Sequence, residues 1–333
     1  MRNALLIVFL MVSGLLVAQN ETDTTYIKTY PKDLQVLPSV RYFRNNIIVK
    51  PNLRTSLNYQ QNATAFGTRV QFDKWGIGLS VPTKLFSGKS NSSSFGVQIQ
   101  AFPKSLMINA GAFRMKGFHQ INLEDSIIEA FYPENQDMQL LHLYLNPIYV
   151  FSKNKFSLRS SLQLTERQLR SSGSFLAAMR VEYLRLKSNN DVIESSQLSN
   201  VLSDYFFRQN AIEVGYAYTQ IIAKNYFISG MLMGGFANTR TGYVQDESKY
   251  HFKKWHFIAP TDLTVSVGYQ SDRYFSSLQV NYRNRNIQSD GVQMETDGLS
   301  IQIVCGIRLA APRLRRALDQ RGEHFKELFA CDR

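Results

Sequence analysis

The chain has 333 residues, a formal net charge of +12 and a mean hydropathy of −0.23. Its basic residues are spread along the sequence, without a Lys/Arg-rich block before the C-terminal tail, which argues against a nucleic-acid partner. The two cysteines, Cys305 and Cys331, form neither a disulfide framework nor a metal-binding pattern. We therefore expect no cofactor, no metal and no nucleic acid.

The N-terminus has the features of a secretory signal peptide. Arg2 supplies a positive charge, and Ala4–Leu16 is an apolar run without a charged residue. We predict cleavage after Ala18, so that residues 1–18 are removed and the mature chain begins at Gln19. No later run of about eighteen apolar residues could form a transmembrane helix. An exported protein of this kind is periplasmic, secreted, or built into the outer membrane as a barrel.

Residues 19–46 show no clean periodicity, and we expect an extended periplasmic segment there. From Ile47 to Leu309, apolar and polar residues alternate in segment after segment, as in strands with one apolar and one polar face. Thirteen such segments can be counted. Because bacterial barrels usually have an even number of strands, either Lys187–Asn210 hides one more strand or one segment is counted in error.

The connections between these segments alternate in length. Short ones, such as Asp73-Lys74 and Ala223–Asn225, alternate with mostly longer ones, among them Asn238–Lys254 and Arg283–Asp297. Outer-membrane barrels have this asymmetry, and aromatic residues beside the short turns are typical of an interfacial girdle. We predict an all-β protein: an antiparallel transmembrane β-barrel of about 12–14 strands over residues 47–309, with short periplasmic turns and longer extracellular loops.

The stretch Lys155–Leu186 is predicted to form a long β-hairpin. Its arms, Phe156–Leu164 and Phe175–Tyr183, alternate strictly, and the polar connection Thr165–Gly173 suits a turn. Arms of about ten residues exceed the usual strand of about five or six and match the nine to eleven or so that span a bilayer.

The last residues, 310–333, are basic and space their apolar side chains as an amphipathic helix interrupted at Gly322. We expect a C-terminal helical tail that contacts the inner leaflet, the barrel mouth or a periplasmic partner. A frayed basic appendage is the alternative.

Several parts of the sequence resemble a known family. The run Tyr149–Leu186, with Tyr26-Ile27, Arg41–Arg44 and Gly215–Thr219, is similar to the domain of unknown function 4421 family of Gram-negative exported barrels. The most specific part of the resemblance is a turn that contains Gln168, Ser171, Ser172, Gly173 and Ser174. The resemblance covers most of the mature chain and implies an outer-membrane β-barrel, but it brings no activity, cofactor or catalytic residue.

No motif for catalysis or metal binding is present, and the histidines have no metal-ligand spacing. We therefore name no catalytic residue and no metal ligand, and we expect the protein not to be an enzyme. A lipid-modifying barrel enzyme, which would need a serine and a histidine that converge in space, stays the third choice.

The polar face of the predicted strands carries more basic than acidic residues. The candidate lumen charges are Lys50, Arg54, Arg69, Arg159, Arg180, Glu182, Glu213 and Arg308. Because unpaired like charges in a confined space repel one another, this excess indicates an anion-preferring pore or an anion-binding site. A salt-bridged, plugged interior is an equally weighted alternative.

We rank first a passive pore or binding barrel for small anionic or polar solutes. A non-conducting structural or surface-interaction barrel, which binds lipopolysaccharide or a protein partner, ranks second. The expected location is the outer membrane, with membrane lipid, lipopolysaccharide and a small anionic solute as partners. An open lumen distinguishes the first class from the second.

Overall fold

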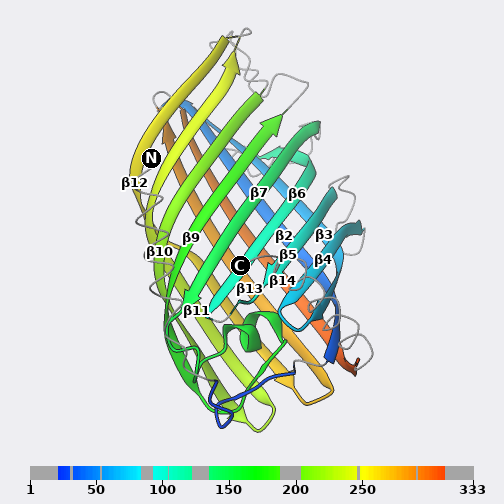
Figure 1. Cartoon of the computed structure of the whole chain (residues 1–333). Helices are drawn as coiled ribbons and strands as arrows, with labels where there is room; N and C mark the ends of the chain where they lie inside the picture. The colour runs from blue at the N-terminus through cyan, green and yellow to red at the C-terminus, as the bar shows by residue number, and fades with distance from the viewer. Residues whose placement is uncertain are drawn as a thin grey trace, which may run out of the picture.

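The computed structural model describes residues 22–30, 33–52, 55–83, 93–103, 105–121, 135–187, 204–245, 248–289 and 292–311. They form a closed antiparallel barrel of twelve tilted strands (Figure 1). The prediction of an all-β transmembrane-type barrel is confirmed. The predicted signal peptide and the predicted helical tail beyond residue 311 lie outside the described residues.

The barrel strands follow one another around the ring in chain order, and β14 closes the ring against β2. They are β2 (Asp33–Asn52), β3 (Thr55–Phe72), β4 (Trp75–Thr83), β5 (Ser93–Ala101), β6 (Leu106–Ile121), β7 (Asn135–Val150), β9 (Ser172–Lys187), β10 (Asp204–Ala223), β11 (Tyr226–Gln245), β12 (Ser248–Gln270), β13 (Tyr274–Ser289) and β14 (Val292–Ala310). Three short elements are not part of the barrel wall: β1 (Ile27–Lys28), η1 (Arg159–Gln163) and β8 (Arg167–Gln168).

The outer face of the barrel is apolar. On β4, the outward side chains of Trp75, Ile77 and Leu79 are each more than half exposed, whereas Gly76 and Gly78 point inward. So much exposed apolar surface is expected where lipid covers it. Among the described residues, no helix is long and apolar enough to cross a membrane.

The barrel begins at Asp33, so the predicted boundary at Ile47 is wrong. Both faces of β2 carry apolar residues, because Leu37 and Phe43 are buried toward the interior while valines alternate with them. The two-residue period that marks a half-polar strand is therefore lost. Pro38 adds to the irregularity, since the pairing of β14 with β2 skips Leu37 and Pro38.

Two predicted loops are mostly strand. In the first predicted loop, Asn238–Lys254, β11 covers residues 238–245 and β12 covers residues 248–254. In the second, Arg283–Asp297, β13 covers residues 283–289 and β14 covers residues 292–297. β11 has 20 residues and β12 has 23, far more than the nine to eleven or so that cross a bilayer. Beyond the bilayer both faces of a strand are hydrated, so the hydrogen-bonded ladder outlasts the apolar alternation.

On the opposite side the wall is short. β4 and β5 have 9 residues each, and beyond their ends β3 pairs directly with β6. The fully buried side chain of Gln61 lies at this junction, where its amide donates to Ser93 O at 3.3 Å and to Lys116 O at 2.8 Å.

The first arm of the predicted hairpin, Phe156–Leu164, is not a strand. After β7 the chain leaves the wall, and β7 pairs directly with β9. The intervening residues 151–171, which we call the plug, fold back into the end of the barrel that carries the short turns, the periplasmic end (Figure 1). This arm is the segment counted in error, because its alternating apolar residues pack inside the barrel.

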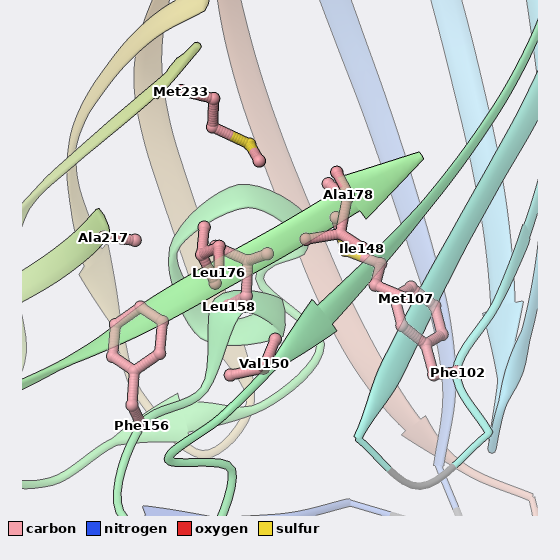
Figure 2. Packing of buried hydrophobic residues seen from close by; sticks show 10 residues of the cluster. All are labelled: Phe102, Met107, Ile148, Val150, Phe156, Leu158, Leu176, Ala178, Ala217 and Met233. Atoms are coloured by element: carbon pink, nitrogen blue, oxygen red, sulfur yellow. The ribbon is translucent and has the colours of Figure 1, made fainter. Parts of the chain in front are cut away.

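The main hydrophobic core lies between the plug and the wall. Figure 2 shows Phe156 and Leu158 of the plug among Val150, Leu176 and Ala217 of the wall. A second cluster surrounds Leu164, which is fully buried and has a left-handed backbone conformation (φ 61°). The plug is thus packed as part of the fold.

The lipid face gives a first prediction. Leu232 lies outward on β11, between the exposed aromatic residues Tyr226 and Phe236 that mark the two interfaces. We expect Leu232→Arg to lower the free energy of unfolding in lipid vesicles by about 2–4 kcal/mol, since the charge enters hydrocarbon. Gln220→Arg, outward near a short turn, should cost about 0–1 kcal/mol. Equal losses in denaturant titrations would contradict this orientation.

Candidate functional site in the barrel lumen

The plug is bound to the wall through its backbone. Six consecutive carbonyl groups, from Ser160 to Thr165, each accept a hydrogen bond from a wall side chain. The donors are Gln270 to Ser160 O (2.6 Å), Ser266 to Ser161 O (3.3 Å), Gln279 to Leu162 O (3.1 Å), Arg69 to Gln163 O (3.1 Å), Arg308 to Leu164 O (2.7 Å) and Gln35 to Thr165 O (3.0 Å). Buried carbonyls without partners are costly, so these donors make the irregular plug backbone tolerable.

The family-motif residue Gln168 fixes the base of the plug. Its Oε1 accepts from the backbone N–H of Ser157 at 2.9 Å, and its Nε2 lies 2.7 Å from Lys155 O and 2.9 Å from Ser172 Oγ. One amide therefore joins the chain entering the plug to the chain leaving it. Sequence reasoning placed Gln168 in a hairpin turn, whereas it belongs to β8, which pairs with β1.

The other motif residues return the chain to the wall. Ser171 Oγ accepts from the N–H of Ile221 at 2.9 Å, and Ser174 Oγ accepts from the N–H of Ser152 at 2.9 Å. At Gly173, a Cβ atom would lie 2.3 Å from Tyr216 Oη and 2.8 Å from the backbone carbonyl of Ala217, so a larger residue would force both the tyrosine and the backbone to shift. The motif thus has a structural role at the junction of plug and barrel.

The residues before the barrel cover the plug from the periplasmic side. We call residues 22–30 the lead-in. The ring of Tyr30 lies 4.1 Å from the guanidinium of Arg308, and its hydroxyl donates to Asp272 at 3.0 Å. Lys28 and Arg167 also bind Asp272, at 2.9 and 3.1 Å. The hydrogen bond from Lys28 holds the pKa of Asp272 below its usual value, and burial raises the pKa of Tyr30 to about 12.

On one side of the lumen, above the plug, lies a buried network of charges. Arg180 binds Glu213 at 2.8 Å and also binds Asp262. Arg283 binds Asp262 at 2.5 Å and Glu182 at 3.5 Å. His142 Nε2 lies 3.7 Å from Glu182 Oε1. Two guanidinium groups therefore face three carboxylates, and this part of the lumen is close to neutral.

The network lies where the wall divides. Asp262 and Arg283 are the last partners of the β12–β13 ladder. Beyond them, within the described part of both strands, β12 pairs only with β11, and β13 only with β14. The ion pair between Asp262 and Arg283 thus closes the end of this seam.

The predicted lumen charges meet different fates. Arg69, Arg180, Glu182, Glu213 and Arg308 point into the barrel interior, whereas Arg159 lies on η1 and binds Glu166 of the plug at 2.9 Å. Arg54 and the side chain of Lys50 lie outside the described residues. The expectation that the basic lumen residues lack carboxylate partners is wrong for Arg159, which pairs with Glu166, and for Arg180, which pairs with Glu213 and Asp262.

Four charged residues were missed. Asp262 and Arg283 lie at strand positions that were assigned to loop edges, although Asp262 shares its parity with the inward Thr264 and Ser266. Arg41 lies in the segment assigned to the periplasm, and Glu166 in the supposed hairpin turn. The parity of Asp262 could have predicted that its side chain faces the lumen. The positions of Arg41, Glu166 and Arg283 could not be predicted, because the alternation does not mark where their strands or the plug begin and end.

A cavity of about 320 Å³ lies directly above the plug, whose Leu162 and Gln163 form part of its lining. The charge network lines one side. On the β2 and β3 side lie Arg41 and Arg69, and neither forms an ion pair among the described residues. The lining also includes the methionines at positions 107, 115, 231 and 233. The lumen therefore combines unneutralised positive charge with adaptable apolar surface.

Residues 21–308 match the family model described as "Domain of unknown function (DUF4421)". The chain belongs to this family. No curated protein matches the sequence. Among solved structures, this DUF4421 protein is similar to the outer membrane protease OmpT from Escherichia coli, with 8% identity, a TM-score of 0.40, and 84% of this chain and 97% of that chain covered.

The translocator domain of the autotransporter NalP from Neisseria meningitidis is also similar, with 8% identity, a TM-score of 0.35, and coverages of 90% and 95%. An outer membrane channel from Pseudomonas putida F1 has 8% identity, a TM-score of 0.37, and coverages of 86% and 100%. These likenesses carry no information on what the DUF4421 barrel binds.

The charge network gives a second prediction. Arg180→Gln removes one of two cations that neutralise Glu213, Asp262 and Glu182, so we expect a loss of about 3–5 kcal/mol in the free energy of unfolding. Adding Glu213→Gln should restore part of this loss, because the stranded carboxylate is removed. Both variants are measured by denaturant titration in lipid vesicles. If Arg180→Gln is as stable as the wild type, the charge network does not stabilise the barrel and the prediction is wrong.

The lead-in gives a prediction in pH. The pKa of Tyr30 is raised from 10.0 to about 12, so its contribution to docking is complete below pH 10 and is lost between pH 10 and 12. The pKa of Asp272 is lowered from 3.8, so its contribution is present above that pH and is lost as the pH falls below it. Protection factors of residues 22–30, which are amide exchange rates corrected for the intrinsic effect of pH, should therefore be high near neutral pH and fall in both outer ranges.

Tyr30→Phe keeps the ring on Arg308 and removes the ionisable hydroxyl, so the loss of protection at alkaline pH should be smaller in this variant than in the wild type. Fast exchange of residues 22–30 at neutral pH in the wild type would show that the lead-in is not docked.

Proposed function

We propose that this protein is an outer-membrane barrel that binds a small anionic or polar solute in its lumen and keeps its periplasmic mouth closed with its own plug. The observation that carries the proposal is the cavity of about 320 Å³ above the plug, with Arg41 and Arg69 on its wall. Sites for small molecules are concave, mostly apolar and supplied with a few polar groups, as this cavity is.

The plug favours a binding barrel over a permanently open pore. Six of its carbonyls are bound to wall side chains, and its apolar residues belong to the main core. Release of solute toward the periplasm would therefore need the plug to move. A channel that opens on ligand binding and a receptor that stays closed share this resting state.

A second candidate is a non-conducting barrel that binds lipopolysaccharide or a protein partner at the cell surface. Strands of 20 to 23 residues on the β10–β12 side favour it, because they rise well beyond the roughly nine to eleven residues that a bilayer needs. The lumen cavity has no place in that function, so we rank it second.

Planar-bilayer recording tests the proposal. The wild type should conduct rarely, because the plug fills the periplasmic end. Arg308→Ala removes the donor to Leu164 O and the cation above Tyr30, so openings should become at least several-fold more frequent. Leu309→Ala, the lipid-facing neighbour, is the control and should behave as wild type.

Heat-modifiable migration on gels verifies that each variant keeps its barrel. A large, steady conductance of the wild type would contradict the closed resting state. Silence of Arg308→Ala and of a second plug variant, Gln270→Ala with Gln279→Ala, would support the structural barrel instead.

A further inference from the structure

A small recess opens from the lumen cavity between β2 and β5. It has a volume of about 40 Å³, and its lining includes Arg41 and Arg69 together with Gly67, Gly78 and Gly96. The three glycines lie on the adjacent strands β3, β4 and β5 and add no side chain of their own to the recess. At Gly96 a Cβ atom would lie 2.3 Å from the ring of Phe113, so the recess wall is closely packed there.

Arg41 and Arg69 each have N–H groups that form no hydrogen bond with the described residues. Arg41 donates to Gln302 Oε1 from Nε at 3.2 Å and from Nη2 at 2.7 Å, which uses two of its five N–H groups. Arg69 binds Gln163 and Gln100, yet its Nε is buried and has no hydrogen-bond partner in the described part of the chain. Among the described residues, both guanidinium groups donate hydrogen bonds only to uncharged groups. A buried cation whose partners are all neutral favours an anion at its remaining donors.

The size of the recess selects among anions. A space of about 10–15 Å³ holds one water, so the volume of about 40 Å³ holds a group of about three heavy atoms. A carboxylate has three heavy atoms, and its two oxygens match the fork of a guanidinium. A tetrahedral phosphate has five heavy atoms, so a carboxylate suits this volume better.

The recess is continuous with the larger cavity, because Arg41, Arg69, Gln98, Phe113 and Gln302 line both. Beyond these residues the larger cavity carries the four methionines and the side chains of Ile148 and Leu162. A group bound in the recess would thus extend its remaining atoms over flexible, apolar side chains. Methionine surfaces adapt to ligands of different outline.

We propose that the lumen recognises a small organic carboxylate, with the carboxylate in the recess between Arg41 and Arg69 and an apolar body in the methionine-lined cavity. This inference rests on the proposed function and names its solute class. The opposite charge network takes no part in recognition, since Arg180 and Arg283 are already bound to carboxylates of the wall.

Calorimetric titration of the full-length protein in neutral-lipid nanodiscs tests the proposal. The probe is phenylacetate, and the matched comparison is phenylacetamide, which has the same shape without the charge. We expect phenylacetamide to bind at least about tenfold more weakly, and Arg41→Gln to weaken phenylacetate by a similar factor. Arg44→Gln, an exposed residue on the same strand, is the control and should leave binding unchanged.

Inorganic phosphate and chloride form two further arms, and each should compete with phenylacetate only weakly. Equal binding of phenylacetate and phenylacetamide, equal binding to wild type and Arg41→Gln, or tight competition by phosphate or chloride would each overturn the carboxylate assignment. In those cases the lumen still binds a solute, and the proposed function stands. If neither probe binds the wild type, the carboxylate assignment is overturned, whereas the proposed function is decided by the bilayer recordings.

Discussion

The structure depends on one constraint: a polar backbone inside a barrel must find its hydrogen bonds there. The six carbonyls of the plug from Ser160 to Thr165 do not belong to a strand ladder. Glutamine, serine and arginine side chains on five wall strands take them up instead. A buried carbonyl or side-chain donor without a partner is costly, and this mutual need holds the plug in one position.

The lumen charges follow from the same constraint. Those near the plug either bind its carbonyls, as Arg69 and Arg308 do, or pair with carboxylates, as Arg180 and Arg283 do. Arg41 does neither, because it donates to the side chain of Gln302. A net positive sequence thus produces a mostly neutral interior with one positively charged region, beside the glycine-lined recess.

The barrel itself was readable from the sequence because lipid imposes a two-residue period on every strand that crosses it. The period failed in three places for physical reasons. In β2, buried Leu37 and Phe43 make both faces apolar. β11 to β14 continue beyond the length that a bilayer spans, where lipid no longer imposes the period. In the plug, Phe156 and Leu158 alternate as a strand would, but they pack against the wall from inside.

The candidate site was only partly readable. Arg69, Arg180, Glu182 and Glu213 were found by parity, because strand geometry alone decides which way they point. Their partners were not, since the pairing of Arg180 with Asp262 joins β9 to β12 across the lumen. Contacts across a barrel depend on its closure and on the plug, neither of which leaves a local pattern in the sequence. The motif Gln168–Ser174 was noticed, yet its role required the plug.

The central claim is that the plug occupies the lumen. It is tested most directly by a disulfide between plug and wall, in a variant with Ser161→Cys and Ser266→Cys and with both native cysteines replaced by serine. Ser266 Oγ lies 3.3 Å from the backbone carbonyl of Ser161, so the two positions are near each other, and the account predicts cross-linking of the folded barrel under a mild oxidant, seen as a shift on non-reducing gels. The pair Ser161→Cys and Val265→Cys, with the second position facing lipid, should stay reduced. Absence of the cross-link, together with rapid labelling of Ser161→Cys by a membrane-impermeant maleimide, would contradict it.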